Sequence, residues 1–303
     1  MRWSPQSLAT LARGRLLRNG GAEIAGAFID SRRPRPGALF VPIIAARDGH
    51  DFLSQAIEGG AAAVLIGPDR PLPPGEATVV QVDNTLAALS GLGAASRARV
   101  DGPVVSITGS NGKTTTRAMI AAVLESAMSS VACTRGNLNN HLGVPLTLLD
   151  EPHEPEAMVI ELGMSAPGEN DHLASIVQPS IAVITSIALE HLEFMGSLEA
   201  IAAAEAEVVP HVRDGGVVVV PGDEPTLVPH LPQGDGPAVL RFSSEDDADV
   251  QVIGVTQGER TEATLRVTGG ERVTVRLQCF GAHNARNAAA ALAVTLSLGW
   301  SPV

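Results

Sequence analysis

A glycine-rich segment that follows a β-branched run constrains this chain of 303 residues more than any other feature. Residues 104–116 read VVSITGSNGKTTT, a pattern that predicts a buried strand, a tight turn containing Gly109 and Gly112, and then a helix. A turn of this kind presents backbone N–H groups and the positive end of a helix to one anion. The segment therefore predicts a phosphate-binding loop.

The residues around the two glycines supply the rest of a nucleotide site. Lys113 adds a positive charge, and Thr114 adds a hydroxyl that can bind Mg²⁺. The widespread form of the loop would require a glycine at the position of Ile107, so a generic ATPase or GTPase is the poorer match. The residues expected to contact the phosphates are Gly109, Ser110, Asn111, Gly112, Lys113, Thr114 and Thr115.

The composition excludes several classes of protein. Hydrophobic residues make up 45% and charged residues 18% of the chain, which is typical of a globular protein and not of a disordered one. A net charge of −12 would repel nucleic acid and anionic membranes, and 3% aromatic residues with no tyrosine do not favour base stacking. We therefore expect no nucleic-acid partner, and a phosphate must be bound locally.

The sequence also favours a cytoplasmic location. No apolar run approaches the roughly 18 residues of a membrane span, and Arg13, Arg15 and Arg18 interrupt the apolar stretch near the N-terminus. Cys133 and Cys279 are too few for a disulfide framework or a zinc site. We expect a monomer in the reducing cytoplasm, without membrane insertion.

The length is sufficient for about two domains. Short strands and helices alternate over residues 1–99, which predicts a small α/β domain. A polar segment at residues 96–103 ends in Gly-Pro and marks the boundary. We assign residues 100–303 to a second domain.

Strand, loop and helix patterns repeat through this second domain. They predict a doubly wound, mostly parallel sheet, whose ligands bind beyond the carboxyl ends of the strands. After Pro237, alternating segments with Gly-containing turns predict antiparallel strands at residues 250–255, 263–267 and 272–277 that extend the sheet. A helix at residues 283–298 follows them, so the fold class is α/β throughout.

Polar residues follow two of the predicted parallel strands. Glu161 ends the apolar strand that starts at Met158, and it could bind a metal ion or cap a nearby loop. His191 follows the strand at residues 181–187, where an imidazole could complete a Mg²⁺ site, orient a phosphate or serve only the structure.

Two segments concentrate asparagines. Asn137, Asn139 and Asn140 could donate hydrogen bonds to a phosphate or a carboxylate, or they could form a hydrogen-bonded turn. Asn284 and Asn287 open the last predicted helix, and they could either start that helix or contact the edge of a base.

Taken together, these segments resemble the Mur ligases in order and spacing. The matching segments are TGSNGKTT (108–115), GNLNNHLGVPLTLL (136–149), ELGMSAPGE (161–169), ITSIALEHLEFMGSLEAIA (184–202) and GAHNARNA (281–288), with DSRRPRPGALFVP (30–42) and DGHDF (48–52) before them. The resemblance is strongest to the branch that adds D-alanyl-D-alanine. The branch that adds the third peptide residue shares the DSR and DGH-type motifs, but GNLNN followed by GVPLTLL favours the former.

The resemblance implies an ATP-dependent amide ligase of peptidoglycan synthesis that uses Mg²⁺. Such a ligase phosphorylates the terminal carboxylate of UDP-N-acetylmuramoyl-tripeptide, and the amine of D-alanyl-D-alanine then attacks the acyl phosphate. It also implies that residues 1–99 bind the UDP-sugar peptide and that residues 100–303 bind ATP. An enzyme of folate polyglutamation is disfavoured by the DSR and DGH segments.

The resemblance assigns roles by motif. Lys113 would neutralise the transferring phosphoryl group, and the implied metal ligands are Thr114, Glu161 and His191. Asn284 and Asn287 would face adenine, whereas Asn137, Asn139 and Asn140 would lie near the phosphoryl acceptor. Ser31 and Arg32 would meet the uridine diphosphate, although an Asp-Ser-Arg tripeptide could equally be a capped turn with a surface arginine.

Two departures from the family pattern bear on activity. Glu205 stands where the family carries a lysine that forms a metal-binding carbamate. Our hypothesis is that Glu205 supplies the metal-facing anion directly, and the alternative is a solvated helix glutamate in a degraded site. The family also has a C-terminal domain beyond the position of Val303, so we expect this chain alone not to complete ligation. A non-catalytic homologue that binds nucleotide or UDP-sugar peptide and regulates wall synthesis stays an alternative.

Overall fold

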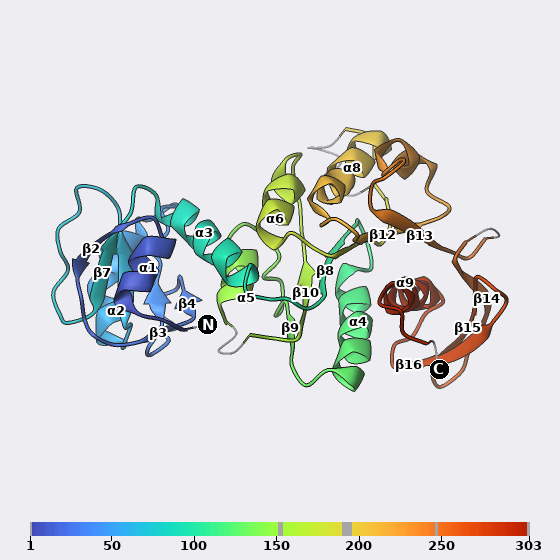
Figure 1. The fold of residues 1–303 in the computed structure, drawn as a ribbon, viewed down its shortest axis with the longest axis horizontal. Helices are drawn as coiled ribbons and strands as arrows, with labels where there is room; N and C mark the ends of the chain where they lie inside the picture. The colour runs from blue at the N-terminus through green and yellow to red at the C-terminus, as the bar shows by residue number, and fades with distance from the viewer. Residues whose placement is uncertain (1, 151–153, 190–195, 246–247, 302–303) are drawn as a thin grey trace. The chain divides into compact units, whose positions relative to one another are not determined.

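A computed structural model describes residues 2–150, 154–189, 196–245 and 248–301, and the chain divides into two compact units (Figure 1). The first unit contains residues 1–101 and 135–155, and the second contains residues 102–134 and 156–303. The chain thus passes into the second unit two residues after the boundary placed at residue 99 and later returns to the first unit.

The return of residues 135–155 to the first unit differs from the division based on sequence. Helix α5 (Gly143–Asp150) packs against α3 (Thr85–Arg97), and the hydroxyl of Ser96 donates to the carbonyl of Leu148. Leu146 and Leu149 of α5 share a buried cluster with the core of the first unit. Apolar contact between segments far apart in the chain decides this grouping.

The first unit is built on a five-stranded sheet. Strands β4, β5, β6 and β7 run parallel, and β2 is antiparallel to β7. The strands in spatial order are β2 (Arg15–Arg18), β7 (Thr78–Gln81), β6 (Ala63–Ile66), β5 (Leu39–Phe40) and β4 (Ala27–Phe28), with a separate pair β1 (Arg2–Trp3) and β3 (Ile24–Ala25). The other helices are α1 (Pro5–Leu11), the 3₁₀ turn η1 (Gly49–Phe52) and α2 (Leu53–Glu58). The apolar run of β6 is buried along its whole length, as expected for a central parallel strand.

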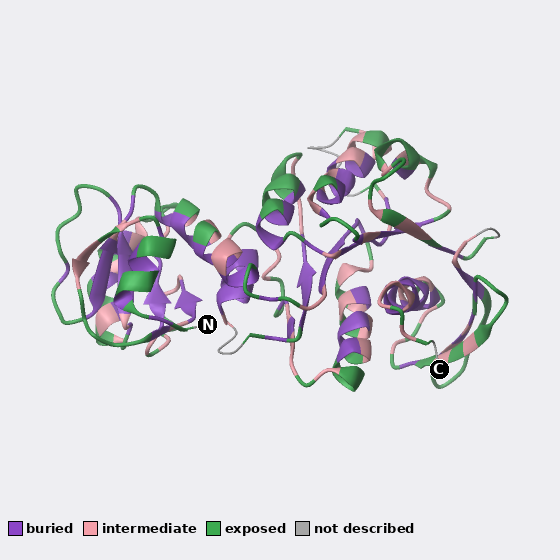
Figure 2. Cartoon of the chain, viewed as in Figure 1, coloured by how far each residue is buried: buried purple, intermediate pink, exposed green. Residues whose placement is uncertain are grey.

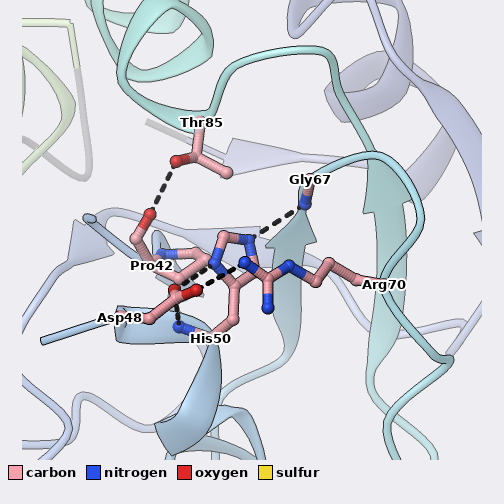
Figure 3. Close-up of polar contacts among 6 residues, drawn as sticks. All are labelled: Pro42, Asp48, His50, Gly67, Arg70 and Thr85. Atoms are coloured by element: carbon pink, nitrogen blue, oxygen red, sulfur yellow. Dashed lines mark hydrogen bonds and ion pairs between the residues drawn. The ribbon is translucent and has the colours of Figure 1, made fainter.

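A cluster of polar side chains joins the loops beyond β5 and β6 (Figure 3). The buried ring of His50 accepts a hydrogen bond from the Gly67 N–H on Nε2 at 3.0 Å, so its proton lies on Nδ1 and is donated to Asp48 Oδ1 at 2.6 Å. The other oxygen of Asp48 pairs with Arg70. The Asp48–Phe52 segment thus ties the loop after β5 to the end of β6.

This cluster makes the first unit sensitive to acid. We expect Asp48→Asn to lower the free energy of unfolding at pH 7 by about 1–3 kcal/mol, because His50 and Arg70 lose a charged acceptor. Hydrogen bonds from His50 lower the pKa of Asp48 below its usual 3.8. The stabilisation is therefore present above that value and is lost as the pH falls through the folded-state pKa. Urea titrations from pH 7 to pH 3 should show the difference from wild type shrinking, whereas exposed Asp51→Asn should change little.

The second unit contains a nine-stranded mixed sheet. Its order is β16 (Arg272–Leu277), β15 (Thr261–Val267), β14 (Val250–Gln257), β13 (Ala238–Ser243), β12 (Val217–Pro221), β11 (Ile181–Ile184), β8 (Val104–Thr108), β10 (Ala157–Glu161) and β9 (Val131–Cys133). The pairs from β9 to β14 are parallel, and β15 and β16 are antiparallel additions. The predicted α/β class, with a mostly parallel sheet and an antiparallel extension, is confirmed.

The strands predicted over residues 250–255, 263–267 and 272–277 are β14, β15 and β16, and they pair antiparallel as predicted. Strand β13, between Pro237 and β14, was not expected, and it runs parallel to β12 and to β14. Alternation identifies the two faces of a strand but not the direction of its neighbour, so the sequence pattern could not show that β14 has a parallel partner as well. Helix α6 (Glu169–Val177) was also not expected, and it starts after Gly168 at a φ of +85°.

Helices cover both faces of this sheet. Figure 1 shows α4 (Lys113–Ala127) and α9 (His283–Ser297) on one face, and α6 and α8 (Leu198–Glu205) on the other. The 3₁₀ turns η2 (Ala206–His211) and η3 (Pro225–His230) contact α8. Val105 and Ile107 of β8 join the core under α4 and α9, and Figure 2 shows that the central strands are buried. Thr108 contacts α6 on the opposite face, so the end of β8 is approached from both sides.

Candidate functional site

The loop after β8 requires glycine at both predicted positions. Gly109 has a φ of +117° and Gly112 a φ of +90°. A Cβ atom at Gly109 would lie 2.3 Å from Thr185 Oγ1 and 2.7 Å from the backbone nitrogen of Thr185, beyond the end of β11. The backbone can therefore fold tightly over the strand ends only because these positions carry no side chain.

The first amides of the loop are used within the protein. The Gly109 N–H donates to Glu205, the Ser110 N–H donates to the Ser186 carbonyl at 2.9 Å, and the Asn111 N–H donates to Ser186 Oγ at 3.0 Å. In the described part of the chain, the amides of residues 112–115 have no acceptor. They belong to the N-cap and the first turn of α4, where helix amides lack internal partners, so they are the N–H groups available to a phosphate.

The side chain of Lys113 is held over the loop by two backbone carbonyls of the loop. Its Nζ donates to the carbonyls of Gly109 at 2.6 Å and Ser110 at 3.1 Å. The charge is therefore placed beside the free amides at the start of α4. This arrangement provides a positive site for a phosphate group.

Glu161 lies beside the same helix, as its place at a strand end predicted. It is only 3% exposed, and the Thr114 hydroxyl donates to its Oε2 at 3.1 Å. Arg117 Nε lies 3.8 Å from the same oxygen, and Thr134 Oγ1 accepts the Glu161 N–H at 2.9 Å. The carboxylate is thus fixed next to a hydroxyl at the end of the loop.

The donor set of Thr114 and Glu161 fits Mg²⁺. A hydroxyl and a carboxylate are hard oxygen donors, and Mg²⁺ is commonly held by one or two carboxylates together with phosphate oxygens and water. Within residues 2–150, 154–189, 196–245 and 248–301 no group of three or more His, Cys, Asp or Glu residues gathers as a metal cage. A site that is completed by bound phosphates agrees with both observations.

Removal of the Glu161 charge should separate metal binding from nucleotide binding. We expect Glu161→Gln to weaken the Mg²⁺-dependent part of ADP affinity by about 10- to 100-fold, because a neutral amide is a poor ligand for Mg²⁺. Calorimetric titration of ADP at several Mg²⁺ concentrations measures this, with Glu125→Gln, at an exposed position of α4, as control. Unchanged Mg²⁺ dependence would exclude Glu161 as a ligand.

Glu205 is buried, so the alternative of a solvated helix glutamate is wrong. It is 3% exposed, and its Oε2 accepts hydrogen bonds from the Gly109 N–H at 2.8 Å, from Asn170 Nδ2 at 3.1 Å and from the Thr108 hydroxyl. Burial raises the pKa of the Glu205 carboxyl, while these hydrogen bonds and the charge of Lys113 oppose the shift. Its role toward a metal ion stays a prediction.

The start of α9 approaches the other side of the loop. A Cβ atom at Gly112 would lie 2.6 Å from Asn287 Oδ1, and Asn287 Nδ2 donates to Asn284 Oδ1 at 3.0 Å. Asn284 is buried and donates to the carbonyl of Phe280 at 2.7 Å. Arg286 pairs with both carboxylate oxygens of Asp223, and this ion pair fixes the start of α9 to the end of β12.

Most of the other candidate residues lie in the first unit, where they bond to neighbouring residues of the protein. In the first unit the buried Ser31 donates to Gln55 Oε1 at 2.8 Å, and the exposed Arg32 pairs with Asp30, whose pKa this hydrogen bonding lowers to about 2. Asn140 Oδ1 accepts from the amides of Leu142 and Gly143 and caps α5. Asn137 and Asn139 share the loop of Asn140, where the Asn139 N–H donates to the Asn137 carbonyl at 2.8 Å. His191, the remaining candidate, lies outside the described residues.

Three residues of the site were not expected from the sequence. Arg117 could have been found, because it lies three residues after Thr114 and therefore on the same face of α4. Thr108 and Asn170 gave no comparable signal, since their partner Glu205 is far away in the chain.

Comparison with known proteins agrees with this geometry. The sequence profile described as the Mur ligase middle domain matches residues 107–295. The chain belongs to the Mur ligase family. The matched range includes the loop, Glu161, Glu205 and the start of α9, so the Mur ligase assignment covers the whole candidate nucleotide site.

Individual Mur ligases match most of the chain. The UDP-N-acetylmuramoyl-tripeptide–D-alanyl-D-alanine ligase of Bacillus subtilis is 40% identical over 92% of this chain and 60% of its own length. A crystal structure of MurF from Acinetobacter baumannii has a TM-score of 0.89 at 32% identity and covers 99% of this chain and 66% of that protein. MurF from Thermotoga maritima, solved in complex with ADP, has a TM-score of 0.81 at 29% identity, with 91% and 64% covered.

The chain spans about 60% of the length of the curated relatives it matches. In the part of the chain that the structure describes, no helix combines the length and apolar character needed to cross a membrane.

Proposed function

We propose that this chain carries the ATP-binding and UDP-sugar-peptide-binding parts of a ligase that adds D-alanyl-D-alanine to UDP-N-acetylmuramoyl-tripeptide. The observation that carries the proposal is the loop with free amides at residues 112–115, beside Lys113 and the Thr114–Glu161 pair. Relatives with this enzyme name align over about 90% of the chain. The reaction belongs to peptidoglycan synthesis in the cytoplasm.

The chemistry of the site suits phosphoryl transfer to a carboxylate. ATP supplies the phosphoryl group, and Mg²⁺ neutralises part of its charge when both are bound. The amides of residues 112–115 and Lys113 bind the phosphates and orient them, while Glu161 and Thr114 hold the cation. The acceptor carboxylate can then approach the γ-phosphorus of ATP and displace ADP to form an acyl phosphate. The amine of the dipeptide attacks the acyl carbon, and inorganic phosphate and a proton leave as the amide forms.

Further roles are proposed for residues outside this centre. Asn284 and Asn287 face the adenine, and the buried, hydrogen-bonded start of α9 supports this because it gives them fixed positions. Ser31 and Arg32 contact the uridine diphosphate from the loop after β4, at the carboxyl edge of the first sheet. Asn137, Asn139 and Asn140 lie near the acceptor carboxylate, and His191 is an additional metal ligand.

Equilibrium binding tests the two halves of the proposal. Calorimetry should find saturable binding of UDP-N-acetylmuramoyl-tripeptide, and of ATP in the presence of Mg²⁺. Arg32→Ala should weaken the first and leave the second unchanged, since the two ligands are assigned to different units. ATP binding without any affinity for the UDP-sugar peptide would instead favour another amide ligase of the superfamily.

A further inference from the structure

A buried carboxylate lies under the first amide of the phosphate loop. Glu205, at the end of α8, receives three hydrogen bonds on one oxygen, Oε2. The donors come from three elements: Thr108 ends β8, Gly109 begins the loop, and Asn170 belongs to α6. One carboxylate oxygen therefore joins the sheet, the loop and two helices.

Glu205 and Glu161 approach the loop from opposite faces of the sheet. Ile107 packs in the core under α4, so the next side chain of β8, Thr108, points to the face that α6 and α8 cover. Glu205 binds Thr108 on that face, whereas Glu161 contacts Thr114 and Arg117 of α4. The two carboxylates therefore have different partners and different effects on the loop.

The contact with Glu205 fixes the conformation of Gly109. Its N–H is bound by Glu205 at 2.8 Å, and its carbonyl accepts from Lys113 Nζ at 2.6 Å. The backbone is thus held on both sides of a residue with a φ of +117°. A glycine without such restraints would sample many conformations and would lose that freedom when a phosphate binds.

We propose that Glu205 is a positioning residue that holds the phosphate loop in its binding conformation through the Gly109 N–H, independently of any metal ion. The proposal rests on the nucleotide site proposed above. It assigns the carboxylate to the loop backbone, so Glu205 contributes to affinity for the phosphates even when Mg²⁺ is absent.

Asn170 keeps this carboxylate in place. It is fully buried, and its Nδ2 lies 3.1 Å from Glu205 Oε2, 3.0 Å from Thr108 Oγ1 and 3.1 Å from the carbonyl of Ala204. Asn170→Ala should therefore weaken nucleotide binding in the same direction as a change at Glu205, and by a smaller factor.

The test compares ADP binding in EDTA with ADP binding in Mg²⁺. Glu205→Ala should weaken metal-free ADP binding by about tenfold or more, while the ratio of the two dissociation constants stays as in wild type. Glu205→Gln keeps an acceptor oxygen and should bind metal-free ADP within a few-fold of wild type. Glu199→Gln, an exposed position on the same helix, is the matched control.

Two results would overturn the proposal. One is metal-free affinity that is unchanged in Glu205→Ala, with only the Mg²⁺-dependent increment lost, because this is the signature of a metal ligand. The other is rapid hydrogen exchange of the Gly109 amide in the wild-type chain, where the hydrogen bond to Glu205 requires protection. The exchange measurement needs neither a variant nor a ligand, so it decides the proposal even if Glu205→Ala does not fold or if the wild type binds no ADP.

Discussion

Replacement of Lys113 by alanine is expected to remove most of the affinity for ATP and nearly all turnover. The amine is placed over the loop by the carbonyls of Gly109 and Ser110, where it can contact the transferring phosphoryl group. We expect ATP affinity to fall by about 10- to 100-fold, and turnover in a form of the protein that completes the reaction to fall by about 10³-fold or more. Calorimetry and a coupled ADP assay measure the two effects.

Lys113 is the only lysine in the sequence, and the other 20 Lys and Arg residues are arginines. An amine-reactive reagent therefore has only Lys113 and the N-terminus as targets. ATP should slow the modification of Lys113 but not that of the N-terminus, which peptide mass spectrometry distinguishes. A Lys113→Ala protein that binds ATP as tightly as wild type, or a lysine that ATP does not protect, would contradict the assignment.

Gly109→Ala is expected to have the second largest effect. The added methyl group would lie 2.7 Å from the backbone nitrogen of Thr185, which cannot move without disturbing the end of β11. A φ of +117° adds strain for any residue with a side chain. We expect ADP affinity to fall by about 100-fold or more and the free energy of unfolding to fall by about 1–3 kcal/mol.

The control for this variant is a glycine without such constraints. Gly91 lies inside α3, and a Cβ atom there would meet no atom within 4 Å. Gly91→Ala should leave ADP binding unchanged and should stabilise the protein slightly. If Gly109→Ala bound ADP like Gly91→Ala, the tight approach of the loop to Thr185 would not matter for the nucleotide.

The loop could be predicted from sequence because its chemistry is local. Gly109, Gly112, Lys113 and Thr114 are consecutive or nearly so, and the strand, turn and helix that place them follow from their neighbours in the chain. Glu161 was found for a similar reason, since the carboxyl ends of parallel strands share one edge of the sheet.

The partners of Glu205 could not be predicted, because they depend on packing across the sheet. Thr108 and Glu205 are 97 residues apart, and Thr108 and Asn170 are 62 apart. For the same reason, the sequence did not predict that residues 135–155 group with the first unit or that β13 runs parallel to β12. Which of the loop amides remain free for a phosphate also depends on such contacts, since Ser186 takes two of them.

The most direct test of the central claim is detection of the ligated product by mass spectrometry. The chain is fused to the part of the Bacillus subtilis relative that it does not match. The fusion is incubated with ATP, Mg²⁺, UDP-N-acetylmuramoyl-tripeptide and D-alanyl-D-alanine, and the intact Bacillus subtilis enzyme is the positive control. The proposed function requires UDP-N-acetylmuramoyl-pentapeptide, one ADP for each product molecule, and loss of both in Lys113→Ala. A folded protein that binds both ATP and the UDP-sugar peptide but forms no product would contradict it and would favour a non-catalytic binding homologue.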